Sequence, residues 1–555
     1  MATARQIATA RQMATPTPNP ERDGPSAASR ELRREVERRR TFAIISHPDA
    51  GKTTLTEKLL LFGGALREAG AVRAQKAARH ATSDWLELEK QRGISVSSSV
   101  LHFDYQGYRV NILDTPGHRD FSEDTYRTLM AADSAVMLID AAKGVEPQTR
   151  KLFEVCRMRQ IPIFTFVNKL DRYGREPLEL MDEIEKVLGI DAIPVNWPIG
   201  TGNAFRGVYD RLGKRALLFS GGDHGTRRPE QEELAGAPAD IQGALGETAD
   251  ELLEGLELLD GAGAELDLER VRAGAQTPMF FGSALSNYGV LPFLESFLEM
   301  SECPGARESS EGAVDPVTAP FSGFVFKIQA NMDPDHRDRL AFVRVCSGRF
   351  EKGMNVRHAR TGKTLRLANS TLLMGKDRAE MAEAFAGDVV GLFDPGLFRI
   401  GDTLCVEGEL HYPGIPSFPP EFFMRVDVAG APKRKALAKG IDQLAQEGAI
   451  QVFQEEPGAG SAAMILGAMG ALQFEVMTHR LEREYKVQLR LVQLPFTAAR
   501  WVGSGFDPNA FRYSETTKLV YDRDDRPVLL FANAWGIESM ARLHPSLELL
   551  TVAGG

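Results

Sequence analysis

A phosphate-binding loop is indicated by nine consecutive residues, Ser46-His47-Pro48-Asp49-Ala50-Gly51-Lys52-Thr53-Thr54. The backbone N–H groups of such a loop turn toward an anion, and the N-terminus of the next helix adds partial positive charge. Lys52 would contact the β- and γ-phosphates of a nucleotide, and the hydroxyl of Thr53 would coordinate Mg²⁺. Ser46 replaces the first glycine of the strict pattern, so for this stretch alone an ordinary surface turn is an equal alternative.

A second polar group follows a second apolar run. Residues 108–113 read as a strand, and Asp114-Thr115-Pro116-Gly117-His118 comes directly after it. An acidic residue at the carboxyl end of a buried strand is placed to hold a water ligand of Mg²⁺, which assigns Asp114 to the metal through water. Gly117 has no Cβ and would let a backbone N–H approach a γ-phosphate.

Two more apolar runs end in residues suited to a base. Residues 161–167 lead into Asn168-Lys169-Leu170-Asp171, and residues 278–281 lead into Gly282-Ser283-Ala284-Leu285. Guanine presents two N–H donors that the carboxylate of Asp171 can accept, whereas adenine would leave that carboxylate unpaired. Small residues in the second motif would let a backbone N–H reach the base carbonyl. Each fragment alone is more often a plain loop.

The elements that must position these motifs are the strands that precede them and the helix predicted over residues 52–62. Strands are predicted over residues 41–45, 100–103, 108–113 and 135–139, in addition to the two before the base motifs. Motifs at the ends of successive strands define a doubly wound sheet with its ligand at the carboxyl edge. The predicted fold is therefore an α/β P-loop domain.

Length and composition bound the remaining possibilities. A chain of 555 residues suggests about three or four domains, and 43% hydrophobic with 26% charged residues is typical of soluble globular proteins. The longest apolar stretches fall well short of the roughly 20 residues that cross a bilayer. The four cysteines are scattered without C-x-x-C spacing, which favours free thiols in a reducing cytosol over a zinc site. We therefore expect a cytoplasmic protein without membrane contact.

The negative charge is concentrated in one segment. Residues 229–269 hold thirteen Asp or Glu and no Lys or Arg, so a net charge of −10 leaves +3 for the rest of the chain. Basic patches for a nucleic acid remain possible elsewhere. For the acidic segment itself a solvated helical face is favoured over a docking surface.

The motifs, in this order, resemble those of the translational GTPases, the group that includes elongation factors Tu and G. The resemblance implies that Ser95, after Arg92-Gly93-Ile94, binds Mg²⁺ together with Thr53, and that His118 orients the attacking water. Lys52, Gly117 and His118 would then be the catalytic set, although a capping or core role stays open for His118. The implied GTP-binding residues are Ser46, His47, Pro48, Asp49, Ala50, Gly51, Lys52, Thr53, Thr54, Asp114, Thr115, Pro116, Gly117, His118, Asn168, Lys169, Leu170, Asp171, Ser283, Ala284 and Leu285.

Composition and strand patterns divide the chain into four parts. Residues 1–34 are polar and rich in proline and are predicted to be disordered, apart from an Arg-rich helix that begins at Glu31. The GTPase domain covers residues 35–305, with a subdomain inserted at about 190–275. Short strands with turn residues over 315–412 predict a small β-barrel.

The last part, residues 416–555, contains a split β-α-β-β-α-β unit followed by a tail with one further strand and a helix. The first helix of the unit opens with Pro432-Lys433-Arg434-Lys435, where a solvated helix start is favoured over contact with rRNA phosphates. The predicted architecture is a GTPase domain, a β-barrel and a ferredoxin-like α+β domain.

This domain order is similar to that of the bacterial release factor three family, the class II release factors. Residues 46–54, 83–95 and 324–334 carry that similarity, and the 61 residues after 494 are too few for the two further domains of elongation factor G. The resemblance implies GTP, GDP and Mg²⁺ as ligands. As partners it implies the ribosome, including ribosomal proteins and the sarcin–ricin loop of its rRNA, and class I release factors, for a protein expected to be a monomer.

Two rival functions remain. Another ribosome-bound GTPase, of the quality-control or tetracycline-protection type, would keep the long C-terminal domains that this chain lacks. A nucleotide-gated binding switch with little hydrolysis is disfavoured by His118. No Gly-Gly-Gln tripeptide, the element that class I release factors insert at the peptidyl bond, occurs in the sequence.

Overall fold

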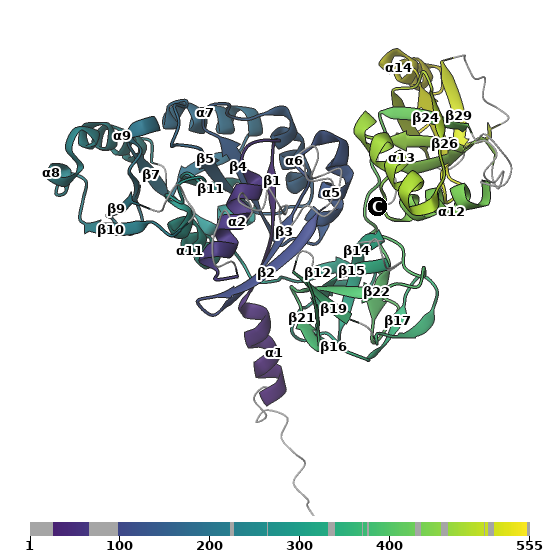
Figure 1. Cartoon of the computed structure of the whole chain (residues 1–555), viewed down its shortest axis with the longest axis horizontal. Helices are drawn as coiled ribbons and strands as arrows, with labels where there is room; N and C mark the ends of the chain where they lie inside the picture. Colours follow the sequence, from purple (N-terminus) through teal and green to yellow (C-terminus); the bar gives the residue numbers. More distant parts are fainter. Residues whose placement is uncertain are drawn as a thin grey trace, which may run out of the picture.

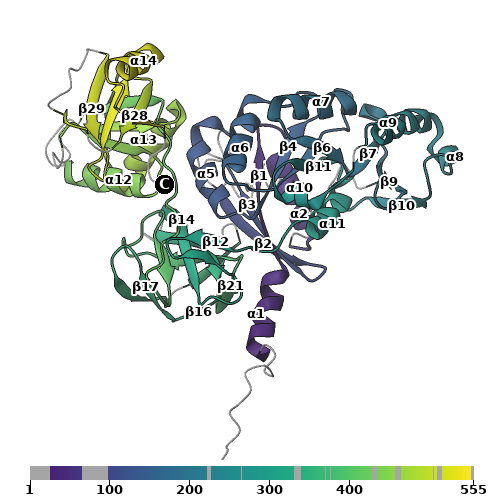
Figure 2. The same ribbon diagram turned by 180° about the vertical axis from the view of Figure 1, so that it is seen from behind.

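The computed structural model describes residues 26–65, 98–221, 227–263, 265–330, 339–368, 370–374, 377–427, 434–456, 464–503, 506–508 and 516–551. The segment that contains Ser95 and the predicted disorder over residues 1–25 lie outside them. Figures 1 and 2 show a central N-terminal domain with an inserted subdomain at one end. A barrel domain and a C-terminal domain lie together at the other end.

The N-terminal domain is built on a seven-stranded sheet in the described residues, with the order β2-β3-β1-β4-β5-β11-β6. Every neighbouring pair is parallel except β2 with β3. The strands are β1 (Arg39–Ser46), β2 (Ser99–Tyr105), β3 (Tyr108–Asp114), β4 (Ser134–Asp140), β5 (Ile163–Asn168), β6 (Asp191–Pro194) and β11 (Gln276–Phe281). The order reverses beside β1, so the predicted doubly wound sheet is confirmed. A ligand at its carboxyl edge stays a prediction.

Alternation along the strands gives this sheet two buried faces. Phe42 and Ile44 pack on one face under helices α2 and α11, whereas Ala43 and Ile45 belong to the core on the opposite face. Successive side chains of a strand point to opposite sides, so both faces must be covered by helices. The helices are α2 (Lys52–Phe62) and α11 (Val290–Met300) on the first face, and α5 (Ser122–Met130), α6 (Pro147–Met158) and α7 (Pro177–Leu188) on the second.

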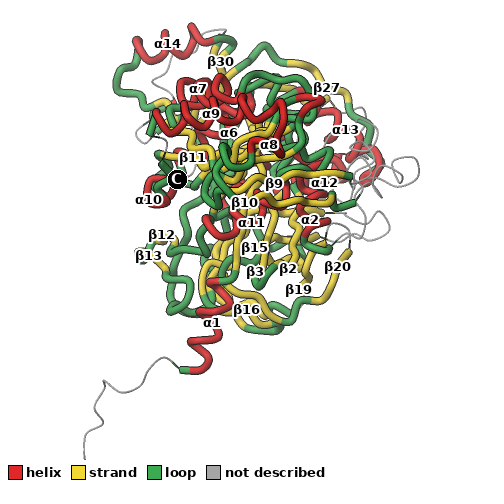
Figure 3. The backbone as a smooth tube through the Cα atoms, turned by 90° about the vertical axis from the view of Figure 1, so that its left-hand side faces the viewer, coloured by secondary structure: helices red, strands yellow, loops and turns green. Residues whose placement is uncertain are grey.

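The inserted subdomain has its own antiparallel sheet, with the order β10-β9-β8-β7. Strands β9 and β10 of this sheet are labelled in Figure 3. Its elements are β7 (Asn196–Ile199), β8 (Gly207–Asp210), β9 (Arg215–Ser220), β10 (Glu230–Ala235), α8 (Gln242–Leu245), α9 (Ala249–Gly261) and α10 (Leu268–Arg272). The acidic stretch predicted to be helical begins instead as strand β10. Its glutamates are exposed and its backbone pairs with β9, so no alternating pattern marks the strand. Strand β6 falls inside the range predicted for the insertion, but it belongs to the main sheet.

The barrel domain consists of strands alone in its described residues, as predicted. After a short hairpin of β12 (Arg307–Ser309) and β13 (Gly312–Val314), its strands surround a core of aliphatic and aromatic side chains. They are β14 (Ser322–Ala330), β15 (Arg339–Ser347), β16 (Arg349–Glu351), β17 (Asn355–His358), β18 (Lys363–Arg366), β19 (Ser370–Met374), β20 (Asp377–Glu380), β21 (Glu383–Phe385), β22 (Val389–Phe393) and β23 (Thr403–Cys405).

The C-terminal domain contains the predicted β-α-β-β-α-β unit, with the strand order β27-β24-β26-β25 and antiparallel neighbours. The tail extends this sheet through β29, β30, β28 and β31. Strand β30 is the one further strand predicted for the tail, whereas β28, β29 and β31 were not predicted. The elements are β24 (Phe422–Asp427), α12 (Arg434–Gln446), β25 (Gln451–Gln454), β26 (Met464–Ala468), α13 (Ala471–Tyr485), β27 (Arg490–Gln493), β28 (Ala498–Val502), β29 (Thr517–Tyr521), β30 (Pro527–Phe531), α14 (Ala534–Leu543) and β31 (Leu549–Leu550).

Helix α1 (Ala27–Glu37) precedes the first strand and starts four residues earlier than the helix predicted from Glu31, so the predicted disorder is wrong for residues 27–30. The side chain of Ser26 caps the helix by accepting the N–H of Ser29 at 3.1 Å. A serine cap in a polar, proline-rich context is easily missed from composition alone.

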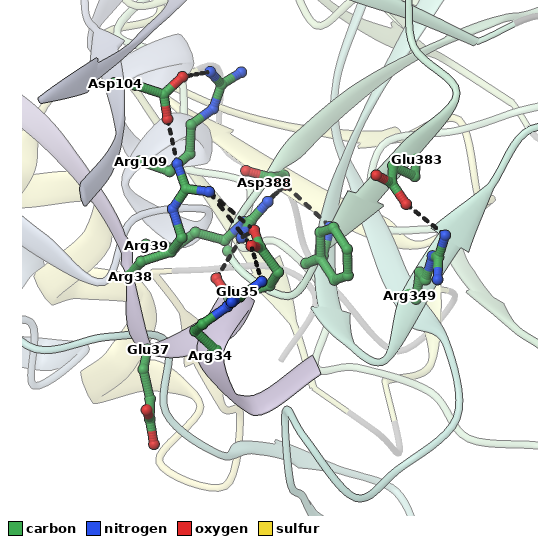
Figure 4. A network of polar contacts seen from close by, with 12 residues as sticks. Arg34, Glu35, Glu37, Arg38, Arg39, Asp104, Arg109, Arg349, Glu383 and Asp388 are labelled. Carbon is green, nitrogen blue, oxygen red and sulfur yellow. Dashed lines mark hydrogen bonds and ion pairs between the residues drawn. The ribbon is translucent and has the colours of Figure 1, made fainter. Parts of the chain in front are cut away.

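A network of ion pairs joins the start of β1 to the barrel domain (Figure 4). The guanidinium of Arg39 lies 2.8 Å from the carboxylate of Asp388, and both side chains are buried. Arg39 also pairs with Glu35 of α1, and Thr41 Oγ1 donates to the carbonyl of Gly387 at 2.7 Å. Strand β1 therefore connects a barrel contact at one end to the phosphate-binding loop at the other.

Replacing Asp388 with alanine would leave Arg39 with Glu35 as its remaining carboxylate partner and would leave the buried N–H of Phe385 without its acceptor. We expect a loss of about 1–3 kcal/mol in the stability of the docked domains, measured as a lowered first transition in calorimetry. The exposed pair between Arg349 and Glu383 provides a matched control in the same domain. Glu383→Ala should cost less than about 1 kcal/mol. Equal shifts for the two variants would contradict the assignment of the buried pair.

The barrel also contacts the residue at which the described chain resumes after position 97. Lys327 Nζ donates to the carbonyl of Ser98 at 2.5 Å and lies 3.5 Å from Asp124 Oδ2. Burial opposes ionisation of Asp124, but the ammonium of Lys327 and hydrogen bonds from Ser98 outweigh it and lower the pKa of that carboxyl. The barrel domain therefore binds Ser98, which comes three residues after the predicted metal ligand Ser95.

No helix among the described residues is long and apolar enough to cross a membrane. The four cysteines are free thiols, and Cys156, Cys346 and Cys405 are buried. Burial raises the pKa of the Cys156 thiol to about 12, so this side chain is an unreactive part of the core.

Candidate nucleotide-binding site

The phosphate-binding loop lies at the carboxyl edge of the main sheet, between the last residue of β1 and the first of α2. Gly51, the residue before α2, has a φ of 103°, which side chains rarely tolerate. A Cβ on Gly51 would also lie 2.4 Å from Asn168 Nδ2. The glycine is therefore required both by the backbone conformation and by the close approach of a second motif.

We expect Gly51→Ala to abolish detectable nucleotide binding in an equilibrium titration, because the loop and Asn168 cannot keep their positions together. Gly64 is the matched control, since it also has a positive φ of 76° but nothing would lie within 4 Å of a Cβ placed on it. Gly64→Ala should cost only the backbone strain, roughly 1–2 kcal/mol of stability, and bind nucleotide normally. Normal binding by Gly51→Ala would contradict the described packing.

Lys52 and Asp114 meet at the centre of this edge. Lys52 Nζ lies 2.6 Å from Asp114 Oδ1, and both side chains are buried. Next to them, Thr115 Oγ1 donates to the carbonyl of Ile44, which fixes the start of the second motif against β1. Gly117 is close enough that a Cβ there would contact Pro48 and Lys52 at 3.6–3.9 Å. The structure therefore brings the first two motifs together.

Asn168 joins three motifs by hydrogen bonds. Its Nδ2 donates to the carbonyl of Ala50 at 2.8 Å, and its Oδ1 accepts the N–H of Ala284 at 2.8 Å. Lys169 Nζ donates to the carbonyl of Asp49 at 2.6 Å and pairs with Asp140 at 2.7 Å. These bonds give Asn168 and Lys169 an architectural part that the sequence analysis did not assign to them.

Asp171, whose carboxylate is predicted to bind the base, is hydrogen-bonded to the described residues through one of its two oxygens. Ser283 Oγ donates to Asp171 Oδ1 at 2.6 Å, and Ser283 itself is fully buried. Asp171 keeps partial exposure, with Arg172 no closer than 3.9 Å. One oxygen is thus fixed by the last motif, while the other is free of hydrogen bonds to the described residues and can accept from a ligand.

Two buried polar atoms in the loop have no hydrogen-bond partner among the described residues, Ser46 Oγ and His47 Nδ1. Buried polar groups are nearly always paired in native proteins, so such atoms suit a site completed by a ligand. Thr53 and Thr54 lie half-buried in the first turn of α2, where a hydroxyl can reach a metal beside the phosphates. The donor set therefore fits a nucleotide with Mg²⁺.

His118 lines a cavity of about 530 Å³ between the N-terminal and C-terminal domains. The cavity is also lined by His47, Pro48 and Gln148 on one side and by Phe422 and Ala471 on the other. His118 Nδ1 accepts the backbone N–H of Asp120 at 3.2 Å. The imidazole thus stands at a domain boundary and next to the phosphate-binding loop.

Every residue predicted to bind GTP is among those the structure describes, and only the predicted metal ligand Ser95 is not. Leu170 and Ala284 are buried, and Leu285 is half-buried next to them. Sequence reasoning missed a function for Asp140, which pairs with Lys169 and also accepts the N–H of Ala142 at 2.9 Å. Its position at the carboxyl end of a predicted strand, like that of Asp114, was the available signal.

Fold and site together define a P-loop GTPase domain followed by a translation-factor barrel. Residues 37–302 match the family model for the elongation factor Tu GTP-binding domain, and residues 320–407 match elongation factor G domain 2. Residues 412–541 match the C-terminal domain of the class II release factor RF3.

Proteins named peptide chain release factor 3 are similar to the chain over nearly its whole length. The one from Symbiobacterium thermophilum is 57% identical over 515 residues, covering 92% of this chain and 97% of its own. The one from a Cyanothece species is 55% identical over 525 residues, covering 94% and 97%. A crystal structure from Thermus thermophilus aligns with 25% identity and a TM-score of 0.66, covering 88% of this chain and 72% of its own. The chain belongs to the peptide chain release factor 3 family.

Proposed function

We propose that this protein is a GTPase of translation termination that drives class I release factors off the ribosome after peptide release. The observation that carries the proposal is that a GTP-binding domain of the elongation factor Tu type and a release-factor C-terminal domain occur in one chain and together line the cavity that contains His118. We place its action in the cytoplasm, with the ribosome as its partner.

Nucleotide binding is proposed to use each motif in turn. Lys52 would leave Asp114 for the β- and γ-phosphates, and Asp171, oriented by Ser283, would accept the N–H donors of guanine. Mg²⁺, held by Thr53, by Ser95 and through water by Asp114, would neutralise charge on the phosphates. Gly117 packs against the loop and can present its N–H to the γ-phosphate.

Hydrolysis is proposed to depend on His118, which would orient the water that attacks the γ-phosphate. A positioned side chain of this kind acts in the transition state and adds little to ground-state binding. The ribosome would raise the rate of GTP hydrolysis by holding His118 in its active orientation. The sarcin–ricin loop and neighbouring ribosomal proteins would make that contact. The absence of a Gly-Gly-Gln tripeptide in the sequence accords with a factor that does not itself cleave peptidyl-tRNA.

A titration of purified protein with GDP, GTP and ATP tests the nucleotide assignment. GDP and GTP should bind, and ATP should compete weakly, since adenine leaves the Asp171 carboxylate without donors. Equal competition by ATP would reject the base assignment. The same titration on Asp114→Ala provides a comparison. This variant removes the partner of Lys52 but keeps Asp171, so the preference for guanine over adenine should persist.

A further inference from the structure

Helix α13 of the C-terminal domain begins against the short turn Arg119–Phe121 that follows His118. Asp120, two residues after the histidine, accepts the backbone N–H of Leu472 with its Oδ2 at 2.8 Å. Leu472 lies in the first turn of α13, where N–H groups lack partners within the helix. A carboxylate there also meets the positive end of the helix dipole. Asp120 thus caps a helix of another domain.

Gly470, the residue before α13, fits this interpretation. Its φ of −158° and ψ of 164° are extended backbone values open to any residue, so glycine is not needed for conformation. A Cβ on Gly470 would lie 1.9 Å from Asp120 Cγ. Glycine also lacks a side chain that could cap the helix itself. The position is therefore suited to let Asp120 approach and take over the cap.

Neighbouring contacts bind the same two surfaces together. Arg127 of α5 donates to the carbonyl of Gly448 at 3.1 Å, and the rings of Tyr126 and Phe418 are 4.3 Å apart. Arg119 pairs with Glu421 at 2.5 Å, but both side chains are largely exposed, so that pair contributes little. Asp120, with only 14% of its side chain exposed, is largely shielded from water, as is Arg127 with 9%.

Two hydrogen bonds therefore hold the segment from His118 to Asp120. The backbone N–H of Asp120 holds His118 Nδ1, and the side chain of Asp120 holds α13. Reorienting His118 to position a water would break its hydrogen bond from the N–H of Asp120, and the bond from Leu472 to Asp120 holds the short turn Arg119–Phe121 in place against α13.

We propose that Asp120 is a positioning residue, a latch through which the docked C-terminal domain keeps His118 in a low-hydrolysis arrangement. Movement of the C-terminal domain releases the turn and frees His118 to orient water. The inference rests on the role proposed for His118. It adds that the position of the C-terminal domain sets the rate of hydrolysis, with the N-terminus of α13 as the point of control.

Gly470→Ala tests the latch from the C-terminal side, leaving every residue of the nucleotide site in place. We expect the Leu472 amide to exchange hydrogen faster, and ribosome-free single-turnover GTP hydrolysis to rise roughly fivefold, the factor that follows from losing one helix cap. GTP affinity should not change. Gly261→Ala, at the open end of α9 where nothing lies within 4 Å of a Cβ, should match wild type in both measurements.

Asp120→Ala and Asp120→Asn test the same contact from the other side. Alanine removes the acceptor of Leu472 and also the carboxylate oxygen 3.5 Å from His118 Nδ1, but it keeps the backbone N–H to His118. It should therefore speed exchange at Leu472 and raise hydrolysis, as Gly470→Ala does. Asparagine keeps an acceptor oxygen without the charge and should fall between alanine and wild type. Combining Gly470→Ala with Asp120→Ala should add nothing further, since each breaks the same contact.

Unchanged exchange at Leu472 in Gly470→Ala and Asp120→Ala would overturn the latch, as would faster exchange without faster hydrolysis. Adding His118→Ala to Gly470→Ala should remove the gain in hydrolysis, and a gain that survives would overturn the proposal too. Failure of the proposed function looks different. It would appear as normal ribosome-stimulated turnover by His118→Ala alone, with the exchange result at Leu472 unaffected.

Discussion

His118→Ala is expected to lower ribosome-stimulated GTP hydrolysis by roughly 10²- to 10⁴-fold, the usual worth of a positioned group that assists proton transfer. GTP affinity should stay close to that of wild type, because the imidazole lines the interdomain cavity and makes no contact with the buried Lys52–Asp114 pair. The measurement is single-turnover hydrolysis on terminating ribosomes, alongside an equilibrium titration of GTP.

An exposed histidine of the barrel domain, His411, provides the matched control, and His411→Ala should hydrolyse GTP normally. Lys52→Ala should behave differently from both, with weakened binding of nucleotide itself, since a cation at the phosphates acts in the ground state as well. Wild-type turnover by His118→Ala would show that another group orients the water and would favour the capping role for this histidine.

Asp171→Asn is expected to change the base preference of the site from guanine to xanthine. Ser283 Oγ can still donate to the amide oxygen of an asparagine, which turns the amide nitrogen toward the base. Two donors would then face each other at guanine, and affinity should fall by roughly 10- to 100-fold, as for a buried polar group left unpaired. Xanthine offers a carbonyl at that place and should bind more tightly than it does to wild type.

Competition of GDP and xanthosine diphosphate against a fluorescent nucleotide measures this exchange. Asp182→Asn, at an exposed position of α7 paired with Lys186, should leave the preference for guanine unchanged. If Asp171→Asn binds both bases with equal affinity, the carboxylate does not read the base edge.

Local sequence predicted those parts of the fold whose signal is continuous in the chain. The helix over residues 52–62 has the predicted bounds, because Gly51 precedes it and apolar residues fill its core-facing side. The strands before each motif were found for the same reason, as short apolar runs that end in a polar group. Exposed β10 has no such run, and only its pairing with β9 makes it a strand.

Contacts between distant residues could not be read from the sequence. Ser283 lies 112 positions after Asp171, and neither residue signals that one would orient the other. Gly470 and Asp120 are separated by the whole barrel domain, so a glycine at a helix start gave no hint of a cap supplied by another domain. The motifs indicated which residue types could bind a nucleotide, whereas the sheet and the domain packing determined which side chains contact one another.

The dissociation rate of a labelled class I release factor from post-termination ribosomes tests the central claim most directly. With GTP, the wild-type protein should speed dissociation, and with GDP it should not. Lys52→Ala should fail with either nucleotide, while His411→Ala should match wild type. A dissociation rate that is indifferent to the protein and to the nucleotide would contradict the proposed function, even if GTP hydrolysis were observed.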